Sequence, residues 1–147
     1  LTVAPCYLQT NEKEKVLASL KDNRQEGVIF RDLNSPYTES RPSSGGTLLK
    51  FKFFTSATCI VTEHNAQRSV KISVRDKDGI YVGVGNCSIP VNYNIPQVGE
   101  LVEVKYLYAY QGGSLYQPSY KGVRTDKNSP DLIDTLKYKN KVQAVAF

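Results

Sequence analysis

The feature that most constrains this chain is a long succession of short segments in which apolar and polar residues alternate, separated by turn residues, from residue 47 to residue 124. Alternation with a period of two, bounded by Gly, Pro, Asn, Asp and Ser, is typical of half-buried β-strands. The strands expected from this pattern are 47–54, 57–63, 69–76, 80–89, 101–110 and 115–124, and a compact apolar segment at 27–32 is expected to form a further strand. The five or so strands between residues 54 and 124 favour a small Greek-key β-barrel of the OB type, although β-sandwiches produce a similar spacing.

Helical character is confined to one segment near the start of the chain. After a short strand expected at residues 3–8, Asn11 is placed as the cap of a helix that runs to Asn23, and Glu14 completes a capping box. The apolar residues of this helix form one stripe, and helical periodicity is almost absent after it. The chain is therefore expected to be mainly β, an α+β fragment with one helix.

Composition limits the class of protein. A chain of 147 residues buries one good core and rarely two of equal size. No apolar run approaches the roughly 18 residues that span a bilayer, so no membrane insertion is expected. The three cysteines are far apart and form no CxxC pair, which argues against a disulfide framework and a zinc site and favours a reducing cytoplasm. The net charge of +5 favours polyanionic partners.

The first cluster with possible chemistry is the hexapeptide Glu26-Gly27-Val28-Ile29-Phe30-Arg31. A carboxylate at the mouth of an apolar strand, next to a glycine that lets another group approach, can support a metal–phosphate site. Hexapeptides of this kind also arise by chance in many strands, so the cluster alone identifies no function.

The second cluster is the strand that contains Lys50 and Lys52. Side chains alternate across a strand, so both lysines project to one face, about 7 Å apart, while Leu49, Phe51 and Phe53 project to the other. Two ammonium groups on a rigid strand can bind a phosphate. The alternative is an ordinary amphipathic strand with two solvated lysines.

The third cluster is Arg124, Asp126 and Lys127, at the end of the last expected strand. A guanidinium there can bind a phosphate bidentately, and the carboxylate can orient a neighbouring cation.

Two further groups of residues are candidates for nucleic-acid contacts. Tyrosines in the last expected strands, interleaved with lysines, could stack on bases and hold backbone phosphates, although such tyrosines are usually half-buried sheet residues. The residues concerned are Tyr106, Tyr108, Tyr110, Tyr116 and Tyr120 with Lys105 and Lys121. Beyond them Lys137, Lys139 and Lys141 recur at every second position, as a phosphate-facing edge or as a solvated edge strand protected by lysines.

Taken in order, the three clusters resemble the C-terminal half of the covalent nucleotidyltransferases, the superfamily of ATP-dependent DNA ligases, RNA ligases and mRNA capping enzymes. Residues 26–31 resemble the fourth motif of that superfamily, Leu49 to Lys52 the fifth, and Arg124 to Lys127 the RxDK motif of its OB domain. The resemblance extends to about residue 130, and RxDK after a barrel points to DNA ligases. It implies three parts: the end of an adenylation (nucleotidyltransferase) domain at 1–53, an OB domain at 54–126 and a tail at 127–147.

The resemblance also implies roles for individual residues. Glu26 would help to bind Mg²⁺. Lys50 and Lys52 would contact the ATP phosphate and act in catalysis. The Arg124, Asp126 and Lys127 side chains would engage the pyrophosphate of ATP when the OB domain closes. Arg31 replaces the lysine of the fourth motif and is counted with the cofactor-binding residues, although its different geometry leaves its role open.

One motif of the family has no counterpart in the sequence. Ligases use the lysine of a KxDG motif as the nucleophile that becomes AMP-lysine. The nearest sequence, Lys77-Asp78-Gly79, lacks the intervening residue and is explained by a hairpin turn. The nucleophile is therefore expected in a missing N-terminal segment of the same protein, and this chain alone is expected to be inactive.

The function expected is part of an ATP- and Mg²⁺-dependent DNA ligase that seals nicks in double-stranded DNA through AMP-lysine and DNA-adenylate intermediates. Lys105, Lys121, Tyr116 and Tyr120 are its expected nucleic-acid contacts. The alternatives are a non-catalytic OB module that binds nucleic acid, and an RNA ligase or capping-type enzyme.

Overall fold

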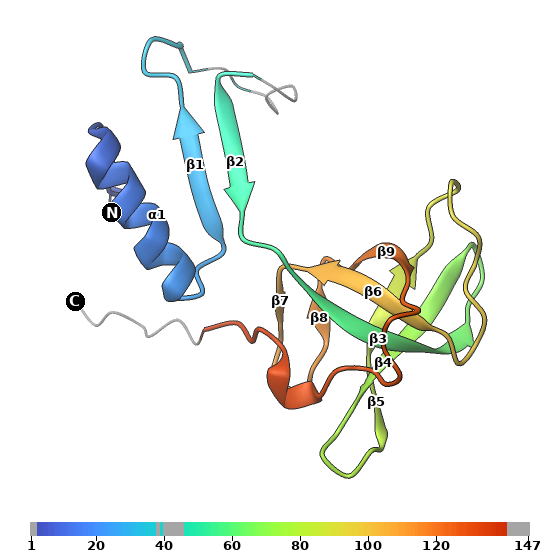
Figure 1. Ribbon diagram of the computed structural model, residues 1–147. Helices are drawn as coiled ribbons and strands as arrows, with labels where there is room; N and C mark the ends of the chain where they lie inside the picture. The colour runs from blue at the N-terminus through green and yellow to red at the C-terminus, as the bar shows by residue number, and fades with distance from the viewer. Residues whose placement is uncertain (1–2, 38, 40–45, 141–147) are drawn as a thin grey trace. The chain divides into compact units, whose positions relative to one another are not determined.

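The structure is a computed structural model that describes residues 3–37, 39 and 46–140 (Figure 1). The chain divides into two compact units, Leu1–Phe53 and Phe54–Phe147. No helix in the described part of the chain is both long and apolar enough to span a membrane.

The first unit contains one helix and one pair of strands. The helix α1 (Thr10–Asp22) lies beside β1 (Gly27–Arg31), which pairs with β2 (Leu48–Lys52) (Figure 1). The strand expected at residues 3–8 is absent, because that described segment has no regular structure.

The expected cap of α1 is also wrong. The helix begins two residues earlier than predicted, with a hydrogen bond of 3.0 Å from the Lys13 N–H to the Gln9 carbonyl. Asn11 therefore lies inside the first turn, where its side chain accepts a hydrogen bond of 2.9 Å from the N–H of the adjacent Glu12. Gln9 takes the cap position without a side-chain hydrogen bond, so the capping box does not form.

The two strands of the first unit leave much apolar surface exposed. They pair antiparallel, with Gly27 opposite Lys52 and Arg31 opposite Leu48. A two-stranded ribbon cannot bury both of its faces by itself. Four large apolar side chains of the ribbon are accordingly 44–62% exposed, those of Ile29, Phe30, Leu49 and Phe51.

The second unit is built on one antiparallel sheet of five strands. Their order across the sheet is β5-β4-β3-β6-β9. The strands are β3 (Thr55–His64), β4 (Ser69–Arg75), β5 (Tyr81–Ser88), β6 (Leu101–Tyr106) and β9 (Ser119–Val123). A short hairpin, β7 (Tyr108–Ala109) with β8 (Leu115–Tyr116), completes the strands. Two of the three longest expected strands, 101–110 and 115–124, are thus each broken into two, because the chain leaves the main sheet to form this hairpin.

This sheet curls in the manner of an OB domain but is not closed into a barrel. The strand order places β5 and β9 at opposite edges, yet the two edges approach each other. Burial raises the pKa of the Cys87 thiol in β5 to about 11, against the opposing effect of a hydrogen bond with the Tyr120 backbone in β9. No ladder of hydrogen bonds joins the two edges within the described residues. The mainly β class is confirmed, with an open sheet in place of a closed barrel.

The hydrophobic core lies inside this curled sheet. It is formed by inward-facing residues of all five strands together with Leu115 and Leu136. The fully buried large side chains are Val61, Val70, Ile72, Val74, Val84, Val102, Val104, Tyr106 and Leu107. Among the described residues, all members of this core cluster belong to the second unit.

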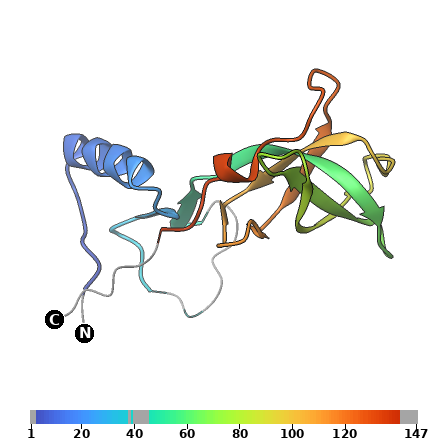
Figure 2. The ribbon, with the colours of Figure 1, turned by 90° about the horizontal axis from the view of Figure 1, so that it is seen from below.

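Residues 127–140 pack against the same core. After β9 the chain forms a loop and returns along β3 to the short 3-10 helix η1 (Ile133–Thr135) (Figure 2). Leu136 is buried, and Tyr138 forms a bridge with Ala109 of β7. Lys139 lies with its ammonium 5.2 Å from the ring centre of Tyr108. Lys141, the third of the lysines that recur at every second position from Lys137, lies outside the described residues.

Candidate functional site

The β1–β2 ribbon brings three cationic residues to one face. Directly opposed residues of an antiparallel pair share a face, and alternate residues along each strand do so too. Because Arg31 is opposite Leu48 and Ile29 is opposite Lys50, Arg31, Lys50 and Lys52 all lie on the same side of the ribbon. The sequence predicted this for the two lysines, and the strand register adds Arg31.

Glu26, the predicted metal ligand, lies at the end of this cationic face. Its carboxylate is 3.6 Å from the ammonium of Lys52, and both side chains are partly exposed, so the pair is weak in water. No group of three or more potential metal-binding side chains is found in the described part of the chain. Mg²⁺ commonly binds one or two carboxylates together with substrate phosphates, and a single carboxylate beside two lysines is compatible with that arrangement.

Gly27 was expected to leave room for a group bound at a metal–phosphate site, and the structure gives it a different role. A Cβ added at Gly27 would lie 2.1 Å from the Phe51 carbonyl oxygen and 2.9 Å from the Lys52 Cα. The group that approaches this glycine is therefore the backbone of β2, not a ligand. The glycine lets the two strands that carry the cationic residues pair closely.

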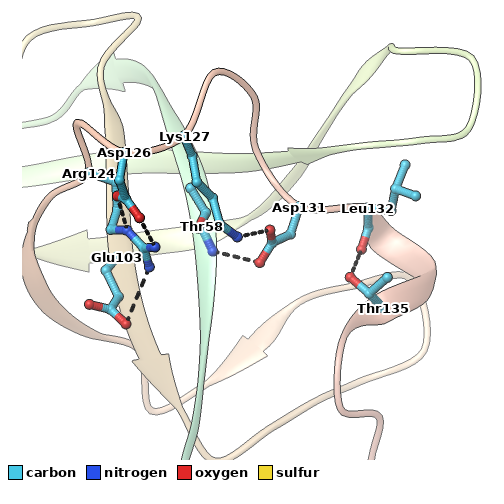
Figure 3. A network of polar contacts seen from close by, with 8 residues as sticks. All are labelled: Thr58, Glu103, Arg124, Asp126, Lys127, Asp131, Leu132 and Thr135. Carbon is cyan, nitrogen blue, oxygen red and sulfur yellow. Dashed lines mark hydrogen bonds and ion pairs between the residues drawn. The ribbon is translucent and has the colours of Figure 1, made fainter.

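The second cationic cluster is the RxDK segment that follows β9, shown in Figure 3. The Arg124 guanidinium donates two hydrogen bonds to Asp126, from Nε to Oδ1 at 2.7 Å and from the Nη2 atom to Oδ2 at 2.6 Å. Its other terminal nitrogen is 3.7 Å from a carboxylate oxygen of Glu103 in β6. These hydrogen bonds from Arg124 lower the pKa of the Asp126 carboxyl to about 2, and the same contact raises the pKa of Arg124.

Lys127, the last residue of the segment, is held by a carboxylate that the motif does not include. Its Nζ donates a hydrogen bond of 2.9 Å to Oδ1 of Asp131 (Figure 3). Oδ2 of Asp131 accepts a hydrogen bond of 2.9 Å from the backbone N–H of Thr58 in β3. Sequence reasoning missed both Asp131 and Glu103. The spacing of four residues between Lys127 and Asp131 was the only signal available for either.

The predicted nucleic-acid residues range from exposed to buried, with Lys105 and Tyr116 partly exposed. Lys121 is exposed, and the Lys105 ammonium lies 4.5 Å from the ring centre of Phe54. Tyr116 stacks on Tyr108 with ring centres 4.8 Å apart. Tyr120 is only 3% exposed and belongs to the core, so in this structure its ring packs against protein.

Comparison with solved structures places this architecture among ligases. A structure from a structure–function analysis of Lig E DNA ligases, concerned with DNA binding by a minimal scaffold, matches with a TM-score of 0.56 at 21% identity. The match covers 80% of this chain and 48% of that one. Structures named Pmar-Lig_Pre and Pmar-Lig_PreS3 match with TM-scores of 0.59 and 0.62, at 22% and 20% identity. Each of these two matches covers 32% of the solved structure, and they cover 82% and 80% of this chain respectively.

No protein-family model and no curated protein matches the sequence. The chain spans about half the length of the Lig E structure and about a third of the two Pmar-Lig structures. At these identities the likeness concerns the fold. The resemblance predicted from the three motifs is confirmed at that level: this chain has the fold of part of a DNA ligase.

Proposed function

We propose that this chain is the part of an ATP-dependent DNA ligase that supplies phosphate contacts to the nucleotide and an OB domain for nicked DNA. The observation that carries the proposal is the cationic face of the β1–β2 ribbon, where Arg31, Lys50 and Lys52 project together in a chain with a ligase fold. Residues 1–53 are the end of the adenylation domain in this proposal, and the OB domain follows at 54–126.

The first reaction of such an enzyme is its own adenylation. A lysine Nζ of the missing N-terminal segment attacks the α-phosphorus of ATP and loses a proton. A P–N bond forms, the bond from the α-phosphorus to the bridging oxygen breaks, and pyrophosphate leaves with the electron pair. Lys50 and Lys52 neutralise charge on the transferring phosphoryl group, which is the kind of fixed electrostatic stabilisation that contributes most to such reactions.

Mg²⁺, held in part by Glu26, would supply further charge neutralisation at the phosphates. Arg124, Asp126 and Lys127 would bind the pyrophosphate when the OB domain closes over the nucleotide. AMP then passes to the 5′-phosphate of a nick, and attack by the 3′-hydroxyl seals the strand and releases AMP. Lys105, Lys121 and Tyr116 are the proposed contacts to DNA in these later steps.

The exposed apolar side chains of the first unit support the presence of a missing segment. Burial of apolar surface is the main force that stabilises a small domain, and here Ile29, Phe30, Leu49 and Phe51 remain largely in water. A nucleotidyltransferase segment packed on the face opposite the cations would cover three of them, Phe30, Leu49 and Phe51. The same segment would bring the nucleophilic lysine.

A second candidate function is supported by the second unit. This unit has its own core and an exposed lysine on its surface, so it can act as a nucleic-acid-binding OB module without chemistry. In that case Glu26, Lys50 and Lys52 are ordinary surface residues. An RNA ligase or capping-type enzyme would differ from the first proposal only in its substrate.

The experiment that separates these functions is intact-mass measurement of protein from the full reading frame, with and without ATP and Mg²⁺. The ligase proposal expects one AMP to be added, on a lysine upstream of Leu1. Lys50→Met and Lys52→Met are each expected to slow adduct formation roughly a hundredfold or more, since each removes a fixed charge near the reacting phosphorus.

Lys71→Met is the matched control for these variants. Lys71 also lies on a strand, and it pairs with Glu63 at 3.8 Å in the second unit. Its replacement is expected to leave adduct formation unchanged. A full-length protein that gains no AMP would overturn the ligase proposal and leave the binding module as the better account.

A further inference from the structure

We propose that Asp131 is a positioning residue for adenylation, one that holds the Lys127 ammonium, a proposed contact of the leaving pyrophosphate, at a fixed position on the sheet of the second unit. This inference rests on the proposed ligase function and adds to it a residue outside the RxDK segment. It follows from the contacts that Asp131 makes with two strands of the sheet.

The backbone of Asp131 is inserted between β3 and β4. The ladder between these strands begins with Ile60 opposite Ser73, and nearer the start of β3 their backbones are bridged by Asp131. The Asp131 N–H donates a hydrogen bond of 2.8 Å to the Thr58 carbonyl, and its own carbonyl accepts one of 3.0 Å from the Arg75 N–H. Asp131 thus takes the place of a strand residue at the point where β3 and β4 separate.

The side chain of Asp131 links Thr58 of β3 to Lys127. One carboxylate oxygen accepts the Thr58 N–H at 2.9 Å, and the other accepts the Lys127 ammonium at 2.9 Å. Charge-assisted hydrogen bonds of this length are among the stronger polar contacts in proteins. The Asp131 side chain is 27% exposed, so water screens the pair with Lys127 only in part.

The contacts of Lys127 differ from those of Arg124, the other cation of the RxDK segment. Arg124 is held by Asp126, which belongs to the same short loop and whose side chain is 64% exposed. The side-chain contact of Arg124 with the sheet is the longer ion pair of 3.7 Å with Glu103 of β6. Lys127 is held by a carboxylate that is hydrogen-bonded to β3, so its position is fixed with respect to the sheet.

Such fixing matters because a lysine side chain is long and has many rotamers. Holding it in advance removes the entropy cost of ordering it when the charge of the leaving pyrophosphate develops. An ammonium group has three N–H donors, and the pair with Asp131 uses one of them, so the group can still bind an anion. Asp131 therefore contributes to adenylation through Lys127 and does not itself contact the nucleotide.

The test is Asp131→Asn in protein from the full reading frame, assayed in two separate reactions. Asparagine keeps an oxygen that can accept the Thr58 N–H and keeps both backbone hydrogen bonds, but it removes the charge that holds Lys127. Single-turnover adenylation with ATP is expected to slow roughly tenfold, which corresponds to about 1.4 kcal/mol. Sealing of DNA that is already 5′-adenylated is expected to be unchanged, because pyrophosphate takes no part in it.

Two controls make the result specific. Asp134→Asn removes an equal charge from an exposed residue of η1 in the same segment, and it is expected to leave both reactions unchanged. In a Lys127→Met background, Asp131→Asn is expected to cause no further loss, since an effect exerted through Lys127 disappears with it.

The possible outcomes separate this inference from the function on which it rests. If the wild-type protein gains no AMP, the ligase proposal itself fails. If it is adenylated and Asp131→Asn is as fast as Asp134→Asn, the positioning role is wrong and the function stands. Equal losses in adenylation and in sealing, or losses that add to those of Lys127→Met, would show that Asp131 only stabilises the fold.

Discussion

Asp126 is the residue whose ionisation is most affected by its neighbour in the RxDK segment. Hydrogen bonds from Arg124 lower the pKa of its carboxyl from an ordinary value of 3.8 to about 2. The paired, ionised form is favoured in the folded protein, and the arginine is oriented by the same two hydrogen bonds. A guanidinium that is oriented in this way presents its remaining donors in a fixed direction.

The lowered pKa of Asp126 predicts how stability depends on pH. A carboxyl whose pKa is lower in the folded than in the unfolded state stabilises the fold above its ordinary pKa, and this contribution is lost as pH falls through the folded value. The urea midpoints of the wild type and Asp126→Asn should therefore differ most above pH 4 and converge as pH falls from about 4 to about 2. In an Arg124→Gln background the replacement should cause no such pH-dependent difference. A constant difference across this range in the wild-type background would contradict the assignment.

At the scale of elements, the pairing of β1 with β2 depends on a single glycine. A Cβ at Gly27 would collide with the Phe51 carbonyl, and the register of the two strands brings Arg31, Lys50 and Lys52 to one face. A slip of one residue would turn a strand's side chains to the opposite face of the ribbon. The proposed phosphate contacts therefore depend on a contact between backbones.

Gly27→Ala is expected to separate the two strands locally and to destabilise the first unit by about 1–3 kcal/mol, the usual cost of inserting a methyl group where there is no room. Hydrogen exchange should become faster at the amides of β1 and β2 and remain unchanged in β3 and β6. Gly83→Ala is the control, because a Cβ at Gly83 would meet only the Lys71 Cε atom at 3.7 Å. Exchange in β1 and β2 that is as slow as in the wild type would show that the close approach is not required.

At the scale of the whole molecule, the sequence carries a net charge of +5 on two units with different kinds of surface. The first unit exposes apolar strands, and the second buries its core and carries the proposed DNA contacts Lys105 and Lys121. Phosphate contacts of this kind release counterions from DNA, so they are visible in the salt dependence of binding.

Binding to nicked duplex DNA is expected to weaken steeply as salt rises. Lys105→Ala and Lys121→Ala should each lower the magnitude of the slope of log K against log [salt] by about one, as the loss of one phosphate contact predicts. Lys71→Ala, which removes an equal charge from an ion pair with Glu63, should leave the slope unchanged. Equal slopes for all four proteins would exclude Lys105 and Lys121 from the interface.

Part of the candidate site was predictable because it depends on local patterns. Lys50 and Lys52 project together as a consequence of strand alternation alone. The partners of the RxDK cations were not predictable in the same way. Glu103 reaches Arg124 because β6 and β9 are neighbours in the sheet, and nothing in the residues around Glu103 indicates this.

The sequence by itself determined that the chain is mainly β, the approximate positions of its strands and the order of its three candidate clusters. These follow from alternation and turn chemistry, which act between residues that are close along the chain. Only the tertiary structure decided that the sheet stays open, that Tyr120 is buried and that Asp131 bonds to Thr58 from 73 residues away. Those outcomes depend on which faces and edges meet after the sheet curls, and no local pattern specifies that meeting.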